Sequence, residues 1–434
     1  MNLIITPSSL DGAVRVPSSK SEAHRLLICA ALSALYNNIE NPERIYIECT
    51  DTNDDIDATA RCLNGIGANI ERTDCGFFVN PITRESLKNI DEDTVIDCGE
   101  SGSTLRFLLP VIPALGIRVK ILMHGRLPER PLSPLYEELI SHGAQISPPG
   151  ENPLTVGRTL TGGEYSIRGD VSSQFISGLL FALPLLKEDS ALTVTGKIES
   201  KPYIHMTLDA LGHFTDKIAG TLPCFKINRD TESSCTAKEL CACGDWSGAA
   251  FWLAAGVVGQ SPLTVNGLNV NTRQGDSAII SVLEKLGGRF SYEDSKIITH
   301  PSKLVGAEID ASQIPDLVPI LATVASVAKG RTVITGAARL RIKESDRLLA
   351  VRKMLCALGA SVIETDDGLI IEGVDTLTGG EVNAYGDHRI AMSAGIAATL
   401  CTSNVKIVGA ESVAKSYPAF WKDYKSLGGS FSNE

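Results

Sequence analysis

The sequence predicts an α/β protein of two domains, assembled from six similar units. Three observations support this prediction: the length of the chain, a short phrase that recurs along it, and the mixture of helical and strand patterns around each copy. The chain has 434 residues, which is more than one hydrophobic core usually accommodates, so two domains are expected. Hydrophobic residues make up 43% and charged residues 21% of the chain, a composition typical of a folded globular protein.

The recurring phrase is the end of an apolar helix, then a glycine, usually a small residue, and the start of a strand. LNGIGANI, which ends at Ile70, and MLCALGASV, which ends at Val362, are two of its copies. A glycine just past an apolar helix is a common left-handed helix stop. The glycines recur every 69 to 76 residues, at Gly67, Gly143, Gly212, Gly287, Gly359 and Gly428. This regular spacing predicts six units, although an α/β protein rich in helix ends could show it by coincidence.

The elements expected along the chain alternate between helix and strand. Residues 26–35 fit an apolar helix, and residues 94–96 fit a strand that leads into another helix. Residues 276–286 carry apolar side chains at helical spacing, residues 361–363 and 369–371 fit short strands, and the small residues of 390–400 fit a helix. Since six such units exceed one core, we expect two domains of three units each, with the ligand site in the cleft between them.

Charge and cysteine usage argue against several classes of protein. The formal net charge of −11 argues against a nucleic-acid partner, which needs a basic surface. We recognise no signal peptide at the N-terminus and no run of about 20 apolar residues, so a cytoplasmic protein with no membrane partner is expected. Eleven cysteines without a CxxC pair indicate reduced thiols, with metal ligation as the alternative.

Five polar stretches combine cations with small or rigid residues at turns, mostly where a helix is expected to begin. They are PSSKSEAHR (17–25), DCGESGSTLR (97–106), GRLPERP (125–131), RLRIKESDR (339–347) and GDHR (386–389). Helix N-termini favour anions, glycine lets a ligand approach the backbone, and arginine pairs bidentately with phosphate or carboxylate. Each stretch taken alone is also typical of a helix cap, a turn or a solvated charged face.

Their similar positions in different units favour one shared site for a ligand with several negative charges. Lys343 and Arg347 are four residues apart, so on a helix they would share a face, and an anion between them would relieve their repulsion. Asp316 and Glu344 are the acids available for proton transfer among these cations. Further polar side chains complete the set: Ser172, Ser173, Gln174, Ser200, Tyr203 and Lys415.

Nine motifs, in this order, resemble those of the 5-enolpyruvylshikimate-3-phosphate synthases: PSSKSEAHR, ESGSTLR, ERP, SSQF, SKPY, IPD, KESDR, DHR and AKSYP. The resemblance spans residues 15–418. It implies an inside-out α/β barrel in each domain, built from three βαβαββ units, with crossovers near Ser18 and Gly244. Residues 19–242 would form one domain and residues 1–18 plus 243–434 the other, with the active site in the cleft between them.

The resemblance implies transfer of the enolpyruvyl group of phosphoenolpyruvate (PEP) to the 5-hydroxyl of shikimate 3-phosphate, with release of phosphate, on the route to chorismate and the aromatic amino acids. It implies these catalytic residues: Asp316, Glu344 and Lys20. The residues implied for PEP are Lys20, Gly102, Arg130, Gln174, Arg347, Arg389 and Lys415. Those implied for shikimate 3-phosphate are Lys20, Ser21, Arg25, Ser172, Ser173, Gln174, Ser200, Tyr203, Asp316 and Lys343. No metal or cofactor is implied, and we expect a monomer.

Three positions depart from the usual family pattern, because Glu100, Arg339 and His24 stand where asparagine is common. Glu100 precedes Gly102 by two residues, and a carboxylate about 4 Å from an anion costs about 4 kcal/mol at an effective dielectric constant of 20. We therefore expect Glu100 to turn away, to bind a proton or to pair with a cation. Pairing with Arg339 is the alternative we favour, since that residue adds a positive charge.

Two other functions are compatible with parts of the pattern. The UDP-N-acetylglucosamine enolpyruvyl transferases share the fold and the PEP donor, but they carry a cysteine in a loop that corresponds to residues 124–131, where this chain has none. They also generally lack the run from Lys343 to Arg347. A non-catalytic anion-binding protein of the same fold would keep the cations and lose the acids, whereas Asp316 and Glu344 are both present.

Overall fold

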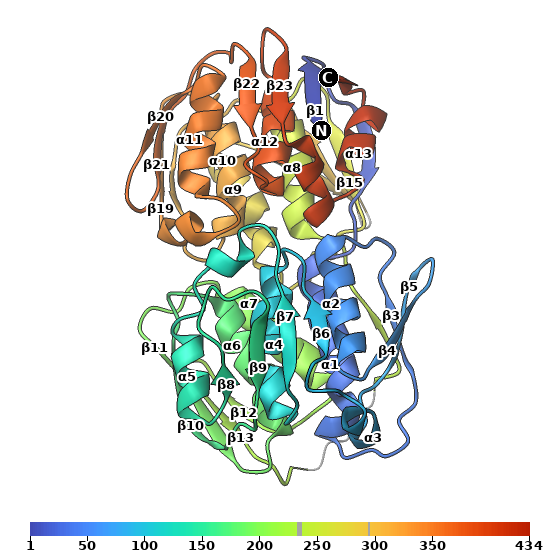
Figure 1. Ribbon diagram of the computed structural model, residues 1–434. Helices are drawn as coiled ribbons and strands as arrows, with labels where there is room; N and C mark the ends of the chain where they lie inside the picture. The colour runs from blue at the N-terminus through green and yellow to red at the C-terminus, as the bar shows by residue number, and fades with distance from the viewer. Residues whose placement is uncertain (232–236, 294–295) are drawn as a thin grey trace. The chain divides into compact units, whose positions relative to one another are not determined.

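The computed structural model describes residues 1–231, 237–293 and 296–434 (Figure 1). The chain divides into two compact units. The continuous unit comprises Lys20–Ala242, and the discontinuous unit comprises Met1–Ser19 together with Cys243–Glu434. Each unit has its own cluster of buried hydrophobic side chains, so each has a core of its own.

The described residues form six four-stranded sheets, three in each unit, and all six share one topology. In every sheet the two strands at one end are parallel neighbours, and the other two pairings are antiparallel, as in β10-β11-β13-β12. In four of the sheets the parallel strands follow one another in the chain and are joined through a helix, the usual connection between parallel neighbours. Each repeat is thus a βαβαββ unit, which confirms the predicted fold class.

The continuous unit contains three of these repeats. The first consists of α1 (Lys20–Tyr36), β3 (Ile45–Glu48), α2 (Asp54–Gly65), β4 (Asn69–Arg72) and β5 (Gly76–Asn80), followed by α3 (Arg84–Lys88) and completed by the distant β14 (Glu239–Cys241). The second consists of β6 (Val95–Asp97), α4 (Gly102–Ala114), β7 (Val119–Leu122), η1 (Leu127–Glu129), α5 (Leu135–Ser141), β8 (Gln145–Ile146) and β9 (Leu154–Gly157). The third consists of β10 (Gly163–Arg168), α6 (Ser173–Ala182), η2 (Leu183–Leu185), β11 (Ser190–Thr195), α7 (Lys201–Gly212), β12 (Ile218–Thr221) and β13 (Cys224–Ile227).

The discontinuous unit contains the other three repeats, and strands from the chain start complete two of them. One consists of β2 (Gly12–Arg15), α8 (Trp246–Val258), β15 (Leu263–Asn266), η3 (Gly275–Ala278), α9 (Ile279–Lys285), β16 (Arg289–Glu293) and β17 (Lys296–His300). The next consists of β18 (Glu308–Asp310), η4 (Pro315–Leu317), α10 (Val318–Ala325), β19 (Arg331–Thr335), η5 (Ala338–Ile342), α11 (Arg347–Ala357), β20 (Ser361–Glu364) and β21 (Leu369–Glu372). The last consists of β22 (Gly380–Asn383), α12 (His388–Ala398), β23 (Val405–Val408), η6 (Ala410–Lys415), α13 (Phe420–Ser426), β24 (Ser430–Asn433) and β1 (Asn2–Thr6).

Hydrophobic burial places helices at the centre of each unit. Every residue of α10 and α12 is buried, and α1, α4, α6 and α8 are buried along almost their whole length. These helices are apolar on all sides, the pattern of a helix that lies inside a core. Most sheet strands instead alternate buried and exposed residues, as in β11, so one face packs inward and the other faces outward.

Five of the six predicted glycine stops are confirmed. Gly67, Gly143, Gly287, Gly359 and Gly428 all adopt positive φ, between 92° and 102°. In each case the glycine N–H and the next N–H donate to carbonyls of the last helical turn, as Gly359 does to Cys356 and Ala360 to Leu355, which is a Schellman cap. The prediction is wrong at Gly212, because that residue is the last helical residue of α7 and the C-cap is His213, in right-handed geometry.

Two predicted helices begin differently in the structure. The first turn of the helix predicted for residues 276–286 is the 3-10 turn η3, and only Ile279–Lys285 is α-helical. The helix predicted for residues 390–400 is α12, which begins earlier, at His388 behind the N-cap Asp387. No helix within the described ranges is long and apolar enough to cross a membrane, and the ten cysteines in those ranges carry free thiols.

Candidate active site

Helix N-termini present most of the predicted residues of the continuous unit. Lys20 and Gly102 are the first residues of α1 and α4, and Ser172 caps α6, where its hydroxyl accepts from the Gln174 N–H. Ser200 caps α7 in left-handed geometry, with φ 53° and ψ 40°, a conformation that costs a non-glycine residue about 1–2 kcal/mol and that is frequent at functional sites. The helix dipoles therefore favour anions at these N-termini.

Arg25 joins α1 to the start of α7. Its Nε donates to Thr207 Oγ1 at 2.9 Å, and its two terminal nitrogens donate to the carbonyls of Ser21 at 2.7 Å and Tyr203 at 3.0 Å. Its guanidinium also lies over the Tyr203 ring, 5.8 Å from the centroid. Burial lowers the pKa of Arg25 to about 10. The structure thus brings together three residues predicted for shikimate 3-phosphate, around a buried cation.

Gly102 lies directly against two guanidinium groups. A Cβ at this position would come within 2.6 Å of Arg130 Nη1 and 3.1 Å of Arg106 Nη1. Arg106 donates to Gln174 Oε1 at 2.9 Å, and Gln174 Nε2 donates to Ser103 Oγ at 2.8 Å, so both ends of the Gln174 amide are held. Three residues predicted for PEP therefore meet at the start of α4, where only a glycine fits.

Lys20 is held by a carboxylate on the next helix. Its Nζ lies 2.9 Å from Asp55 Oδ2 of α2, and both side chains are largely buried. Glu100, two residues before Gly102, has its carboxylate packed over Gly125, whose added Cβ would lie 2.5 Å from Glu100 Oε2. Arg126, in the same loop, is an exposed residue whose side chain lies 3.7 Å from Glu129. Of the two arginines in that predicted stretch, only Arg130 is placed beside Gly102.

Three carboxylates surround the fully buried Arg347 in the discontinuous unit. Its nitrogens lie 2.8 Å from Asp316 Oδ1, 2.7 Å from Glu344 Oε2 and 2.7 Å from Asp387 Oδ2. Burial lowers the pKa of Arg347, but the three carboxylates outweigh it and raise that pKa above its ordinary value. Arg347 is therefore the fixed positive centre of the cluster.

Asp316 accepts from two arginines. Besides Arg347, it contacts Arg389, whose Nη2 lies 3.2 Å from Asp316 Oδ2 and whose Nη1 donates to the Asp316 carbonyl at 3.1 Å. Burial raises the pKa of Asp316, but Arg389, Lys343 and Arg347 together hold it far below the usual range. Asp316 is accordingly ionised at neutral pH and able to accept a proton.

Lys343 and Arg347 do not share a helix face, so that prediction is wrong. Lys343 follows the short helix η5 in extended backbone geometry, whereas Arg347 is the first residue of α11. The N-cap residue Asp346 separates these helices, and its side chain accepts from the Leu349 N–H. Burial lowers the pKa of Lys343 to about 8, against the opposing effect of Asp316 and Glu344.

The remaining predicted cation, Lys415, lies at the end of η6 and donates from Nζ to the Gly386 carbonyl at 2.8 Å. It is therefore tied to the turn before Asp387 and Arg389. Arg339, the other departure from the family pattern, donates to the Ser312 carbonyl at 3.1 Å. Arg341 pairs with Asp346 and Glu364, so this part of the stretch is a salt-bridged surface, as the alternative interpretation proposed.

Four residues of these clusters were given no role from the sequence, although Arg106 and Asp387 lie within two of the five stretches. Asp387, which is fully buried, caps α12 and also accepts from Ser345 Oγ at 3.0 Å. Asp55 and Arg106 hold Lys20 and Gln174. Asp276 is buried beside Ser247, and burial, with the nearby Asp316, raises its pKa to about 6. An aspartate at a helix start signals only a cap, so the sequence does not reveal which cation faces it.

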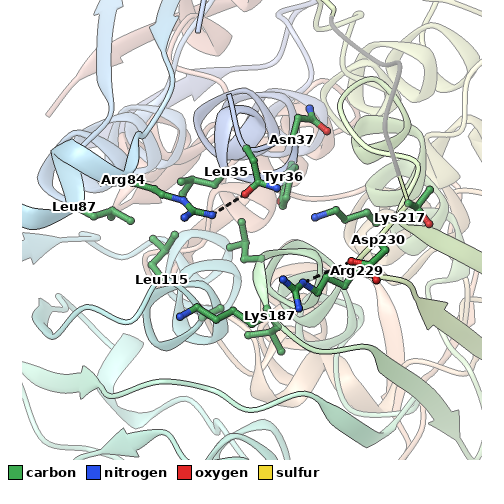
Figure 2. A pocket seen from close by; sticks show the side chains of 15 residues that line it. Leu35, Tyr36, Asn37, Arg84, Leu87, Leu115, Lys187, Lys217, Arg229 and Asp230 are labelled. Atoms are coloured by element: carbon green, nitrogen blue, oxygen red, sulfur yellow. Dashed lines mark hydrogen bonds and ion pairs between the residues drawn. The ribbon is translucent and has the colours of Figure 1, made fainter. Parts of the chain in front are cut away.

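A pocket of about 840 Å³ lies at the other end of the continuous unit, and none of the predicted site residues lines it. Figure 2 shows Arg84, Lys187, Lys217 and Arg229 around it. It is bounded by the C-terminal ends of α1, α4 and η2, where helix dipoles favour cations rather than anions. Lys217 Nζ accordingly donates to the Pro184 carbonyl at 3.3 Å. Lys217 thus compensates a helix end, unlike the predicted cations at the helix N-termini.

Comparison with known proteins identifies the family. The model of the EPSP synthase (3-phosphoshikimate 1-carboxyvinyltransferase) family matches residues 4–424. A 3-phosphoshikimate 1-carboxyvinyltransferase of Clostridium kluyveri is 43% identical over 428 residues, covering 98% of this chain and 97% of that one. One from Clostridium perfringens strain 13 is 44% identical over 430 residues, 98% of each chain. An EPSP synthase structure from Acinetobacter baumannii has the same fold, with a TM-score of 0.80 at 24% identity over 100% of both chains. The chain belongs to the EPSP synthase family.

Proposed function

We propose that this chain transfers the enolpyruvyl group of PEP to the 5-hydroxyl of shikimate 3-phosphate, releasing phosphate, through the residues predicted from its sequence. The observation that carries the assignment of roles is the cluster at Arg347, where two acids, Asp316 and Glu344, share one buried guanidinium. Acids held among cations suit a reaction that moves protons beside a multiply charged anion.

PEP brings a phosphate and a carboxylate, and arginines bind both groups bidentately. In the proposal its anionic groups contact cations of both units, with Gly102 allowing close approach to the backbone. The residues assigned to PEP are Lys20, Gly102, Arg130, Gln174, Arg347, Arg389 and Lys415. Hydrogen bonds from Arg106 and to Ser103 fix the Gln174 amide, so its orientation is set before the substrate arrives.

Shikimate 3-phosphate is assigned to polar side chains near the starts of α1, α6 and α7, together with Asp316 and Lys343 of the discontinuous unit. The residues assigned to it are Lys20, Ser21, Arg25, Ser172, Ser173, Gln174, Ser200, Tyr203, Asp316 and Lys343. Among the described residues, Lys343 Nζ makes no hydrogen bond within the protein, so its donors remain available to a ligand.

Asp316 takes the proton of the 5-hydroxyl as that oxygen attacks C2 of PEP. In the free protein the two arginines make Asp316 a weak base, because they stabilise its charge. PEP anions that engage Arg347 and Arg389 would offset those positive charges and raise the Asp316 pKa. The base therefore gains strength when PEP is bound.

Glu344 is assigned to the methylene of PEP and Lys20 to the reacting centre. C3 gains a proton as the C2–O bond to shikimate 3-phosphate forms, giving a tetrahedral intermediate. The C2–O bond to phosphate then breaks while C3 returns a proton, which leaves an enol ether and free phosphate. We further propose that the chain acts in the cytoplasm as a monomer. Sedimentation equilibrium can check the oligomeric state.

Phosphate release tests the proposal directly. The purified chain with PEP and shikimate 3-phosphate should release phosphate and form enolpyruvylshikimate 3-phosphate, whereas PEP with UDP-N-acetylglucosamine should release none. Phosphate release from PEP with UDP-N-acetylglucosamine but not with shikimate 3-phosphate would assign the chain to the other enolpyruvyl transferases. Binding of PEP without turnover of either acceptor would identify a non-catalytic anion-binding protein.

A further inference from the structure

His24, one of the departures from the family pattern, is completely buried on α1. It lies one turn after Lys20 and directly before Arg25. Its Nδ1 is 2.6 Å from Thr59 Oγ1 of α2. Asp55, which pairs with Lys20, precedes Thr59 by one turn, so α1 and α2 are tied together at two successive turns.

The contact with Thr59 is the first step of a buried chain of hydroxyl groups. Thr59 Oγ1 lies 2.6 Å from Thr104 Oγ1, and Thr104 Oγ1 donates to Ser101 Oγ at 2.8 Å. None of these four side chains belongs to a residue more than 1% exposed. We call His24, Thr59, Thr104 and Ser101 the hydroxyl relay; it connects α1, α2 and the N-cap of α4.

The direction of the relay follows from counting hydrogens. Thr104 has one hydroxyl hydrogen and donates it to Ser101, so in its contact with Thr59 it must accept. Thr59 therefore donates its own hydroxyl hydrogen to Thr104, and its oxygen must accept a hydrogen bond from His24. His24 therefore carries its hydrogen on Nδ1. Burial, with Lys20 and Arg25 nearby, lowers the pKa of His24 and keeps the ring neutral.

The relay ends where α4 meets the guanidinium groups. Ser101 Oγ accepts from both the N–H and the hydroxyl of Thr104, at 3.2 and 2.8 Å, which fixes the first turn of the helix. The next residue is Gly102, which is packed against Arg130 so closely that a Cβ would not fit. A small shift of this turn would change the distance from the Gly102 backbone to Arg130.

We propose that His24 is a positioning residue for PEP. Its hydrogen bond to Thr59, continued by those from Thr59 to Thr104 and from Thr104 to Ser101, fixes the first turn of α4. This turn holds the Gly102 backbone at the right distance from Arg130. The inference rests on the proposed function, which assigns Gly102 and Arg130 to PEP. His24 itself touches neither substrate in this account. Its role is to supply one hydrogen to a fixed chain of acceptors.

Two isosteric replacements separate this role from simple packing. In His24→Asn the amide Nδ2 can occupy the place of the histidine Nδ1 and still donate to Thr59, whereas His24→Leu has nearly the same shape and no donor. Loss of one buried hydrogen bond is worth about 1 kcal/mol, or about five- to ten-fold. His24→Leu and Thr59→Val should raise KM for PEP by that factor and change KM for shikimate 3-phosphate less than two-fold. His24→Asn should stay within about two-fold of wild type for both substrates.

Thr323→Val is the matched control for Thr59→Val. Thr323 is a fully buried helical threonine in α10, and its hydroxyl donates only to the local Pro319 carbonyl, so this variant should lose stability without changing KM for PEP. Thermal unfolding of each variant confirms that the assay samples folded protein. Equal effects of His24→Asn and His24→Leu, or an unchanged KM for PEP in Thr59→Val, would overturn the inference. A wild-type protein without phosphate release would instead refute the proposed function, whatever the relay variants do.

Discussion

At the scale of single residues, the proposed chemistry depends most on Asp316 and Glu344. Both acids contact the guanidinium of Arg347, yet their surroundings differ, because Asp316 is also paired with Arg389. Removing either acid leaves the cations in place. Such a change should therefore impair proton transfer more than it impairs the binding of anionic substrates.

We predict that Asp316→Ala and Glu344→Ala each lower kcat by about 100-fold or more, the scale of general acid–base catalysis. Steady-state phosphate release measures kcat, and fluorescence or calorimetric titration checks that PEP and shikimate 3-phosphate still bind. Glu364→Ala is a suitable control, because Glu364 pairs with Arg341 and Arg352 in the same unit but is not assigned to the site. A variant of Asp316 or Glu344 with more than half of the wild-type kcat would refute the role assigned to that residue.

Lys343 leads to a prediction about pH. Its pKa of about 8 lies below the ordinary value of 10.5, so the ammonium is charged below pH 7 and loses its proton as pH rises through 8. The neutral amine binds an anion less well, so kcat/KM for shikimate 3-phosphate should fall above pH 8. In Lys343→Arg the side chain stays charged, and the alkaline fall should move upward by at least one pH unit. Lys406→Arg, at a lysine that pairs with Glu381 and Glu434 and is not assigned to the site, should leave the pH profile unchanged. An alkaline fall that Lys343→Arg does not move would exclude Lys343 as its cause.

At the scale of elements, the glycine phrase predicts helix ends because it encodes a backbone conformation. Where the glycine has positive φ, any side chain is strained. At Gly212 the same phrase lies inside α7, so the backbone needs no glycine there. The sequence cannot distinguish the two cases, since both show an apolar helix followed by glycine.

We predict opposite effects of alanine at these two kinds of position. Gly212→Ala should increase the free energy of unfolding by about 0.5–1 kcal/mol, the difference in helix propensity, because no atom lies within 4 Å of the added Cβ. Gly428→Ala, at φ 95°, should decrease it by about 1–2 kcal/mol. Urea unfolding of both variants gives the two values. Destabilisation by Gly212→Ala would mean that Gly212 is a left-handed helix stop like the other five glycines.

The sequence predicts the repeats but not how distant strands complete them. Local patterns identify the helix–strand alternation. However, β14 pairs with β3, and β2 pairs with β15, although the two strands of each pair are far apart in the sequence. Those pairings depend on tertiary packing, which short-range patterns do not record. The same reason explains why the hydroxyl relay and the Asp387 contacts were missed: each joins polar residues from different helices. The assignment of substrates to the predicted residues remains a prediction.

At the scale of the whole molecule, Glu100 and Arg339 belong to different units, and we predict that they are coupled when PEP is bound. If they pair, Arg339→Asn should be less harmful in a Glu100→Gln background than in the wild type. A double-mutant cycle on KM for PEP measures this coupling. In the free protein the Glu100 carboxylate packs over Gly125, so reorientation is the competing explanation. Effects that are additive within about 0.3 kcal/mol would favour reorientation or protonation over pairing.

The distribution of cations between the two units leads to the last prediction. Lys20 and Arg130 belong to the continuous unit, whereas Arg347, Arg389 and Lys415 belong to the discontinuous unit, and all five are assigned to one PEP molecule. Cations that approach one another repel, so without a ligand their electrostatics oppose closure. An anion between them reverses the sign of that interaction and also excludes water, which strengthens the remaining ion pairs.

Saturating PEP together with shikimate 3-phosphate should therefore compact the protein, and small-angle X-ray scattering should record a smaller radius of gyration. Sodium chloride at the same ionic strength is the control, because it screens the net charge of −11 without bridging the cations. Arg347→Ala should abolish the ligand-dependent change, since it removes the fixed positive centre of the discontinuous unit, whereas Arg352→Ala, on the same helix but outside the site, should retain it. An unchanged radius of gyration at saturating ligands would mean that closure of the two units is not part of substrate binding. It would also contradict the assignment of cations from both units to one PEP molecule, because that assignment requires the ligand to draw them together. These cations are Lys20, Arg130, Arg347, Arg389 and Lys415.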